Sequence, residues 1–162
     1  MKEMQRIADQ LDRAGQGNAW HGPSLGEILG DIETGEATMR PIPDAHSIWE
    51  IVLHIAVWEG VVAGRFEGDP REPTTPEEDW PPIAMPGDGA WRQAVDALTA
   101  SRARLRRALL AFDESRLGET VPGKDYPFYV MAHGIVQHDL YHGGQIALLK
   151  RAVRSASTGA LS

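Results

Sequence analysis

The sequence contains six histidines and no cysteine, so any metal site must use nitrogen and oxygen ligands. His138 and His142 are four residues apart, which on a helix places two imidazoles one turn apart on one face. His54 lies at the edge of the apolar stripe of an earlier helical segment. Three inward-facing imidazoles can supply three ligands of a divalent ion and leave one position for water or substrate. The pattern favours an open metal site over three histidines that each satisfy a separate core hydrogen bond.

Glu50 and Tyr141 are the predicted catalytic groups. Glu50 precedes His54 by one helical turn, so its carboxylate can orient the imidazole or act as a base. Tyr141 adjoins His142 and can hydrogen-bond a substrate on the open side of the metal. Each residue also has an ordinary explanation, because Glu50 suits a solvated helix edge and Tyr141 suits packing. Further polar candidates for orienting or base roles are Glu59, Asp139 and Gln145.

The other three histidines are weaker candidates. His133 falls almost opposite His138 and His142 on the same helix, which predicts a surface or packing residue. His46 stands at a helix start, where a polar residue near free backbone groups is ordinary, and we assign it no chemistry. His21 lies in a connection that can fold over the bundle and contribute to a pocket.

Five segments carry apolar residues at helical spacing and must position these groups. They are Met1–Ala14, Ser24–Asp31, Ser47–Glu67, Asp88 to about Gly118, and Pro127–Arg154. The second is a brief extension, so four long helices remain. No segment shows the alternation or paired turn signals of a sheet. The sequence therefore predicts an all-α four-helix bundle, with the histidine pair on its last long helix.

Two stretches of small or charged residues carry further predictions. The connection Gly68–Gly89 is rich in proline, glycine and acids, contains Trp80, and is long enough to act as a lid over the metal. Gly143 and Gly144 each cost about 1 kcal/mol of helix stability relative to alanine, which indicates close approach of another backbone. A cluster of arginines in the third long helix is interpreted as a solvated face and comprises Arg102, Arg104, Arg106 and Arg107.

Composition limits the class of protein. The length of 162 residues and the 42% apolar content suit one domain over residues 1–162. The net charge of -7 disfavours nucleic acid as a partner, since an acidic surface repels phosphate. No apolar run approaches the length of a membrane span, and the first residues lack a secretory pattern. We therefore expect a soluble, cytoplasmic protein without a membrane partner.

Two runs resemble the DinB/YfiT-like superfamily of metal-dependent enzymes. They are AHSIWEIVLHIAVWEG at Ala45–Gly60 and HGIVQHDLYHGGQIALLK at His133–Lys150. The resemblance implies a four-helix bundle whose metal triad is His54, His138 and His142. It also implies nickel or zinc as the ion, frequent homodimers, and in some members transfer reactions of a low-molecular-weight thiol such as bacillithiol or mycothiol.

Two functional hypotheses follow from the residues and the resemblance. The first is an enzyme whose divalent ion activates water or a low-molecular-weight thiol for hydrolysis, or for S-transfer to a small electrophilic substrate. The second is a noncatalytic helical module in which the metal only fastens helices or a dimer interface. A fourth protein ligand would favour the second hypothesis, and a solvent ligand the first.

Overall fold

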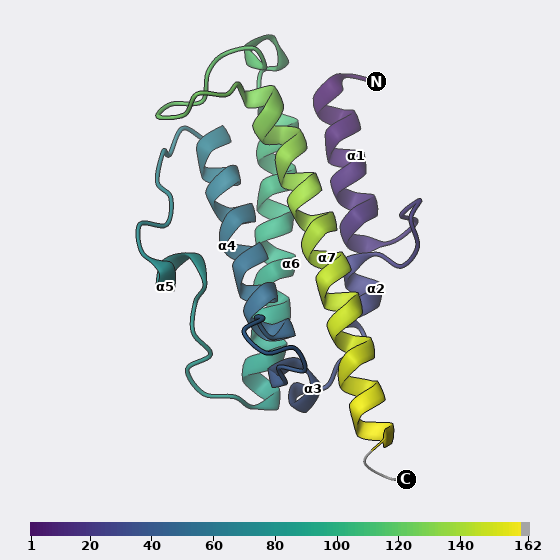
Figure 1. The fold of residues 1–162 in the computed structure, drawn as a ribbon. Helices are drawn as coiled ribbons and strands as arrows, with labels where there is room; N and C mark the ends of the chain where they lie inside the picture. The colour runs from purple at the N-terminus through teal and green to yellow at the C-terminus, as the bar shows by residue number, and fades with distance from the viewer. Residues whose placement is uncertain (160–162) are drawn as a thin grey trace.

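The computed structural model describes residues 1–159, and within them the protein consists of helices and connections without a β-strand. Four long helices pack side by side (Figure 1). They are α1 (Glu3–Gln16), α4 (Ile48–Phe66), α6 (Asp88–Ala111) and α7 (Phe128–Gly159). The shorter elements are α2 (Leu25–Leu29), α3 (Thr34–Thr38), α5 (Pro76–Asp79) and the 3₁₀ helix η1 (Glu114–Arg116). The predicted all-α four-helix bundle is confirmed.

Serine caps begin two of the helices where the sequence predicts. Ser47 Oγ accepts the backbone N–H of Glu50, and the Glu50 carboxylate accepts the backbone N–H and the hydroxyl of Ser47. Ser24 and Glu27 form the same reciprocal pair at the start of α2. These capping boxes satisfy N–H groups that a helix start leaves without intrahelical partners.

Other helix boundaries differ from the prediction. α1 begins at Glu3 and α7 continues to Gly159, beyond the predicted end at Arg154. α6 ends at Ala111, well before Gly118, because Phe112 adopts an extended conformation (φ -69°, ψ 137°) and packs its ring on Phe66 and Phe128. Tertiary packing therefore overrides the continuing apolar periodicity. The helices α3 and α5 are too short to produce a periodic pattern and were not predicted.

The core consists of two apolar clusters separated by a polar layer. One cluster includes Val62, Leu105 and Ile135, and the other includes Ile55 and Leu98. Along each of α4, α6 and α7, a buried charged residue stands between the two clusters; these residues are Glu59, Arg102 and Asp139. We call these three residues the buried charge cluster. The polar layer runs through the middle of the bundle, where α4 and α7 also carry the three candidate metal ligands.

Within residues 1–159, no helix combines the length and the apolar content needed to cross a membrane.

Candidate metal centre

The three predicted metal ligands converge on one point. His54 comes from α4, and His138 and His142 occupy successive turns of α7. One ring nitrogen from each lies within 4.8 Å of the others. The Nε2 atoms of His54 and His138 are 3.1 Å apart, close to the separation of about 3.4 Å expected for two nitrogens bound tetrahedrally to one zinc ion. The donor set therefore fits a divalent ion.

Hydrogen bonds fix the orientation of two of the rings. His54 Nδ1 lies 2.9 Å from the backbone oxygen of Asp79, and His142 Nδ1 lies 2.6 Å from Gln145 Oε1. Both partners are carbonyl oxygens, which only accept, so each Nδ1 must carry the hydrogen. The Nε2 lone pairs of His54 and His142 are therefore free to bind a metal. Such outer partners commonly fix the tautomer of metal-binding histidines.

Burial keeps the three imidazoles neutral. Desolvation, together with the nearby rings of His138 and His54, lowers the pKa of His142 to about 4, although the hydrogen bond that His142 donates to Gln145 acts in the opposite direction. Desolvation also lowers the pKa values of His54 and His138. Because a protonated imidazole cannot bind a metal, these shifts keep the ligands competent at neutral pH.

The connection between α4 and α6 covers the histidines, as the sequence predicted. The indole of Trp80 stacks on His54 with ring centroids 3.8 Å apart and planes 5° apart. Its other face stacks on His46 at 3.6 Å and 2°. Trp58 donates its indole N–H to Asp79 Oδ1 at 2.7 Å and thereby ties the end of α5 to α4. His46 therefore has a structural role that sequence reasoning missed, because its partner Trp80 lies in an irregular segment without periodicity.

Solvent reaches the cluster on the α7 side. The side chain of His138 is 24% exposed, whereas that of His54 is 7% exposed. Tyr141 is exposed and places its ring 5.1 Å from that of His142. The cluster is therefore more open to solvent at His138 than at His54.

The buried charge cluster lies directly behind His138. Arg102 donates from Nε to Glu59 Oε1 at 2.8 Å and from Nη2 to Asp139 Oδ2 at 2.9 Å. Asp139 Oδ1 and His138 Nδ1 face each other at 3.7 Å, and both are buried without a hydrogen-bond partner among residues 1–159. A small movement of the ring would let His138 Nδ1 donate to this carboxylate, so Asp139 is placed to orient the third ligand.

Two carboxyl groups share one arginine in this cluster. Burial, reinforced by the negative charge of Asp139, raises the pKa of Glu59 to about 8. Burial also raises the pKa of Asp139. Both shifts favour the protonated form of a carboxyl group, so the pair is a candidate to share one proton beside the single positive charge of Arg102.

The arginine prediction was wrong for one residue. Arg102 is buried, whereas Arg104 pairs with Glu67 and Arg106 with Asp12 on the surface, as a solvated face predicts. The burial of Arg102 could have been predicted from its spacing, because it follows Leu98 by four residues and therefore lies on the buried stripe of α6.

Several other predicted residues lie away from the histidines or have a different local role. The Glu50 carboxylate holds the start of α4 and accepts a hydrogen bond from Arg40. His133 lies 3.6 Å from Glu3 and next to Tyr129, which agrees with a packing role. His21 is exposed and lines a surface pocket with Trp20.

The prediction for the glycine pair was wrong. A Cβ added to Gly143 or Gly144 would meet no atom within 4 Å among the described residues outside the local helix backbone, so no other backbone approaches them. Both glycines instead line a cavity of about 440 Å³ beside Asp139.

Comparisons with known proteins agree with the fold. The sequence profile of the DinB superfamily matches residues 20–146, a range that includes His54, His138 and His142. The crystal structure of a conserved protein from Enterococcus faecalis superimposes with a TM-score of 0.74 at 20% identity, covering 96% of this chain and 99% of that chain. A search of curated proteins gives no match.

Proposed function

The chain belongs to the DinB superfamily, and from this premise we propose that it is a metal-dependent enzyme acting on a small electrophilic molecule. His54, His138 and His142 hold one divalent ion, Ni²⁺ or Zn²⁺. The observation that carries the proposal is the pair of carbonyl acceptors on His54 Nδ1 and His142 Nδ1, which direct two lone pairs toward one point. An ion held by three neutral imidazoles lowers the pKa of a bound water or thiol and so supplies a nucleophile at neutral pH.

The protein supplies the surroundings of this reaction. Trp80 and Trp58 exclude water from the α4 side and keep the His54 ring fixed. Tyr141 stands on the exposed side, where its hydroxyl hydrogen-bonds the substrate. Asp139 and Gln145 hold the rings of His138 and His142. Glu50 helps to position His54 indirectly, because its carboxylate caps the start of α4 one turn before this histidine.

A low-molecular-weight thiol fits the chemistry as cosubstrate. The chain has no cysteine of its own. In the transfer reaction, the thiol loses its proton, its sulfur forms a bond to the electrophilic carbon, and the leaving group departs with the electrons of the broken bond. Hydrolysis uses water in the same place. The two reactions can be distinguished by assaying metal-loaded protein against one electrophile with and without bacillithiol or mycothiol.

Metal content tests the proposal first. Elemental analysis of the wild type is expected to give near one divalent ion per chain, and His142→Ala is expected to lose it. His133→Ala is the matched control, because it removes a histidine from the same helix that contacts Glu3 instead of the cluster. Equal and negligible metal in all three folded proteins would contradict the proposal. Loss of metal in both His142→Ala and His133→Ala would show that metal binding does not depend specifically on the three clustered histidines.

The second candidate is a noncatalytic module that uses the metal to stabilise the bundle and pairs as a homodimer. Exposed apolar side chains on α7 support it, since Tyr141 is 66% and Leu148 is 60% exposed. Under this hypothesis, Leu148→Glu converts a dimer to a monomer in solution scattering. X-ray absorption spectroscopy of the metal-loaded protein should then show no water ligand, because a fourth protein ligand completes the site.

A further inference from the structure

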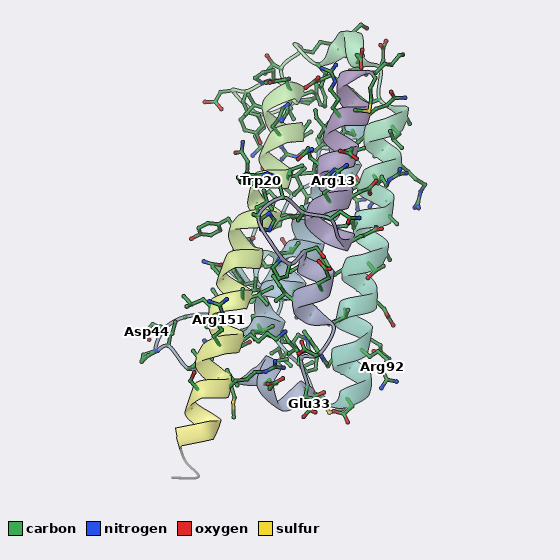
Figure 2. The ribbon with its side chains drawn as sticks, turned by 90° about the vertical axis from the view of Figure 1, so that its right-hand side faces the viewer. Arg13, Trp20, Glu33, Asp44, Arg92 and Arg151 are labelled. Atoms are coloured by element: carbon green, nitrogen blue, oxygen red, sulfur yellow. The ribbon has the colours of Figure 1, made fainter. Side chains whose placement is uncertain are left out.

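A cavity separate from the metal centre lies between α2, α3 and α6, and none of the three candidate metal ligands lines it. Its volume of about 840 Å³ falls in the range typical of small-molecule sites, roughly 300–1,000 Å³. Figure 2 faces this side of the molecule, with Glu33 between α2 and α3 and Arg92 on α6 at the same end of the bundle. Both residues line the cavity.

One part of the cavity wall is apolar. Leu25, Leu29 and Leu98 line it together with Trp91. Trp91 donates its indole N–H to the backbone oxygen of Ile32 at 2.9 Å, so its polar atom is already satisfied. The indole therefore presents an apolar surface, and this part of the wall suits a hydrocarbon body.

A charged group with unused donors stands in the cavity wall. Arg102 lines the cavity although it is only 5% exposed. Its Nε and Nη2 atoms bind Glu59 and Asp139, but Nη1 makes no hydrogen bond with any residue in the range 1–159. Gly15 allows this placement, because a Cβ there would lie 2.1 Å from Arg102 Nη1. The two N–H donors of Nη1 are therefore available to a ligand in the cavity.

Charge decides which acceptor suits these donors. Glu59 and Asp139 already supply two carboxyl groups to the single positive charge of Arg102. An anionic ligand would place a further negative charge beside these carboxyl groups, whereas a neutral oxygen would not. We propose that the cavity binds a small molecule with an apolar body and an uncharged acceptor, an amide, ester or ketone carbonyl, which accepts hydrogen bonds from Arg102 Nη1. This proposal stands independently of the metal site.

Nuclear magnetic resonance titration of the full chain tests the proposal. The probe is N-hexylacetamide, and hexanoate and hexylammonium share its chain length but carry charged heads. Saturable shifts are expected for the backbone amides of Gly26, Gly30 and Gly35, all of which line the cavity. N-hexylacetamide is expected to bind more tightly than either charged probe. The shifts should persist in His142→Ala, which separates this site from the metal centre.

Cavity-blocking variants complete the experiment without touching Arg102. Thr99 is exposed on α6 and lines the cavity, so Thr99→Phe is expected to fold and to reduce affinity by about tenfold or more. Ala100→Phe is the control, because Ala100 is exposed on the same helix but does not line the cavity. Absence of saturable shifts, equal loss in both variants, or binding of hexanoate as tight as that of N-hexylacetamide would overturn the proposal.

Discussion

His54 Nδ1 lies 2.9 Å from the backbone oxygen of Asp79, the last residue of α5. A candidate metal ligand on α4 is therefore held by the long connection that follows it. The next residue in that connection, Trp80, stacks on the same imidazole. The conformation of this connection and the orientation of the His54 ring are thus coupled.

Removing the Trp80 indole should loosen the cover of the metal centre. Trp80→Ala is expected to release metal to a chelator several-fold faster than the wild type, because His54 loses its stacked partner and water gains access. Met85→Ala is the control, since Met85 is 80% exposed in the same connection. Stopped-flow release with a chromogenic chelator measures the rates, and identical rates in all three proteins would contradict the prediction.

Gln145 should tune metal affinity through His142. Gln145→Leu removes the acceptor on His142 Nδ1 and is expected to weaken metal binding by about 10- to 100-fold. Gln145→Glu retains an acceptor oxygen and should bind at least as tightly as the wild type. Competition against a chelator of known affinity measures both, and an unchanged affinity of Gln145→Leu would refute the role of this contact.

The metal-free protein should lose stability in mild acid. The pKa of His142 is lowered to about 4 from an ordinary value of 6.5. The unfolded chain therefore binds a proton at this histidine below about pH 6.5, whereas the native protein binds it only below about pH 4. The free energy of unfolding falls through this window as pH falls. This one group accounts for about 3 kcal/mol across the window. The lowered pKa values of His54 and His138 act with the same sign.

Urea unfolding of chelator-treated protein between pH 7 and pH 4 measures this dependence. His142→Gln lacks the group and should show a shallower fall, while acids on the surface contribute equally to both proteins. Parallel curves for the two proteins would show that His142 titrates normally in the native state.

The buried charge cluster should respond differently to loss of its cation and of one anion. Arg102→Met leaves two buried carboxyl groups without a positive partner and is expected to cost about 3–5 kcal/mol of unfolding free energy. Glu59→Gln preserves the shape and removes the acid whose pKa is raised to about 8. Stability tied to a raised acid pKa is lost as pH rises toward that value.

The wild type should therefore lose stability between pH 6 and pH 8 relative to Glu59→Gln. Chemical denaturation of both variants at several pH values provides the measurement. A constant difference between wild type and Glu59→Gln over this range would rule out the proposed sharing of one proton between the two carboxyl groups.

The sequence predicts the long helices and the meeting of the histidines because both depend on helical spacing. Apolar residues at spacings of three and four define the faces of α4 and α7, and these faces carry His54, His138 and His142. The covering segment was also predicted from its length and its tryptophan. Its route and its contact with His46 depend on tertiary packing, for which an irregular segment has no periodic signal.

The ion pairing of Glu59 and Asp139 with a buried Arg102 was not predicted, although the positions of all three residues are regular. Glu59 follows Ile55 by four residues, and Asp139 follows Ile135 by four, as Arg102 follows Leu98. Residue type predicted exposure for Arg102, while spacing predicted burial. The three charges can be buried only together, because each satisfies another, and such mutual compensation between distant segments is not visible in any one helix.

The convergence of α4 and α7 also has a consequence for the unfolded chain. His54 and His138 are 84 positions apart in the sequence, and the chain has no cysteine with which to join such distant points. An ion bound by histidines from both α4 and α7 would act as a reversible cross-link. By loop-closure entropy, a link across this distance restricts the unfolded ensemble by about 4.5 kcal/mol. The same histidines that suit chemistry would therefore tether the two halves of the molecule.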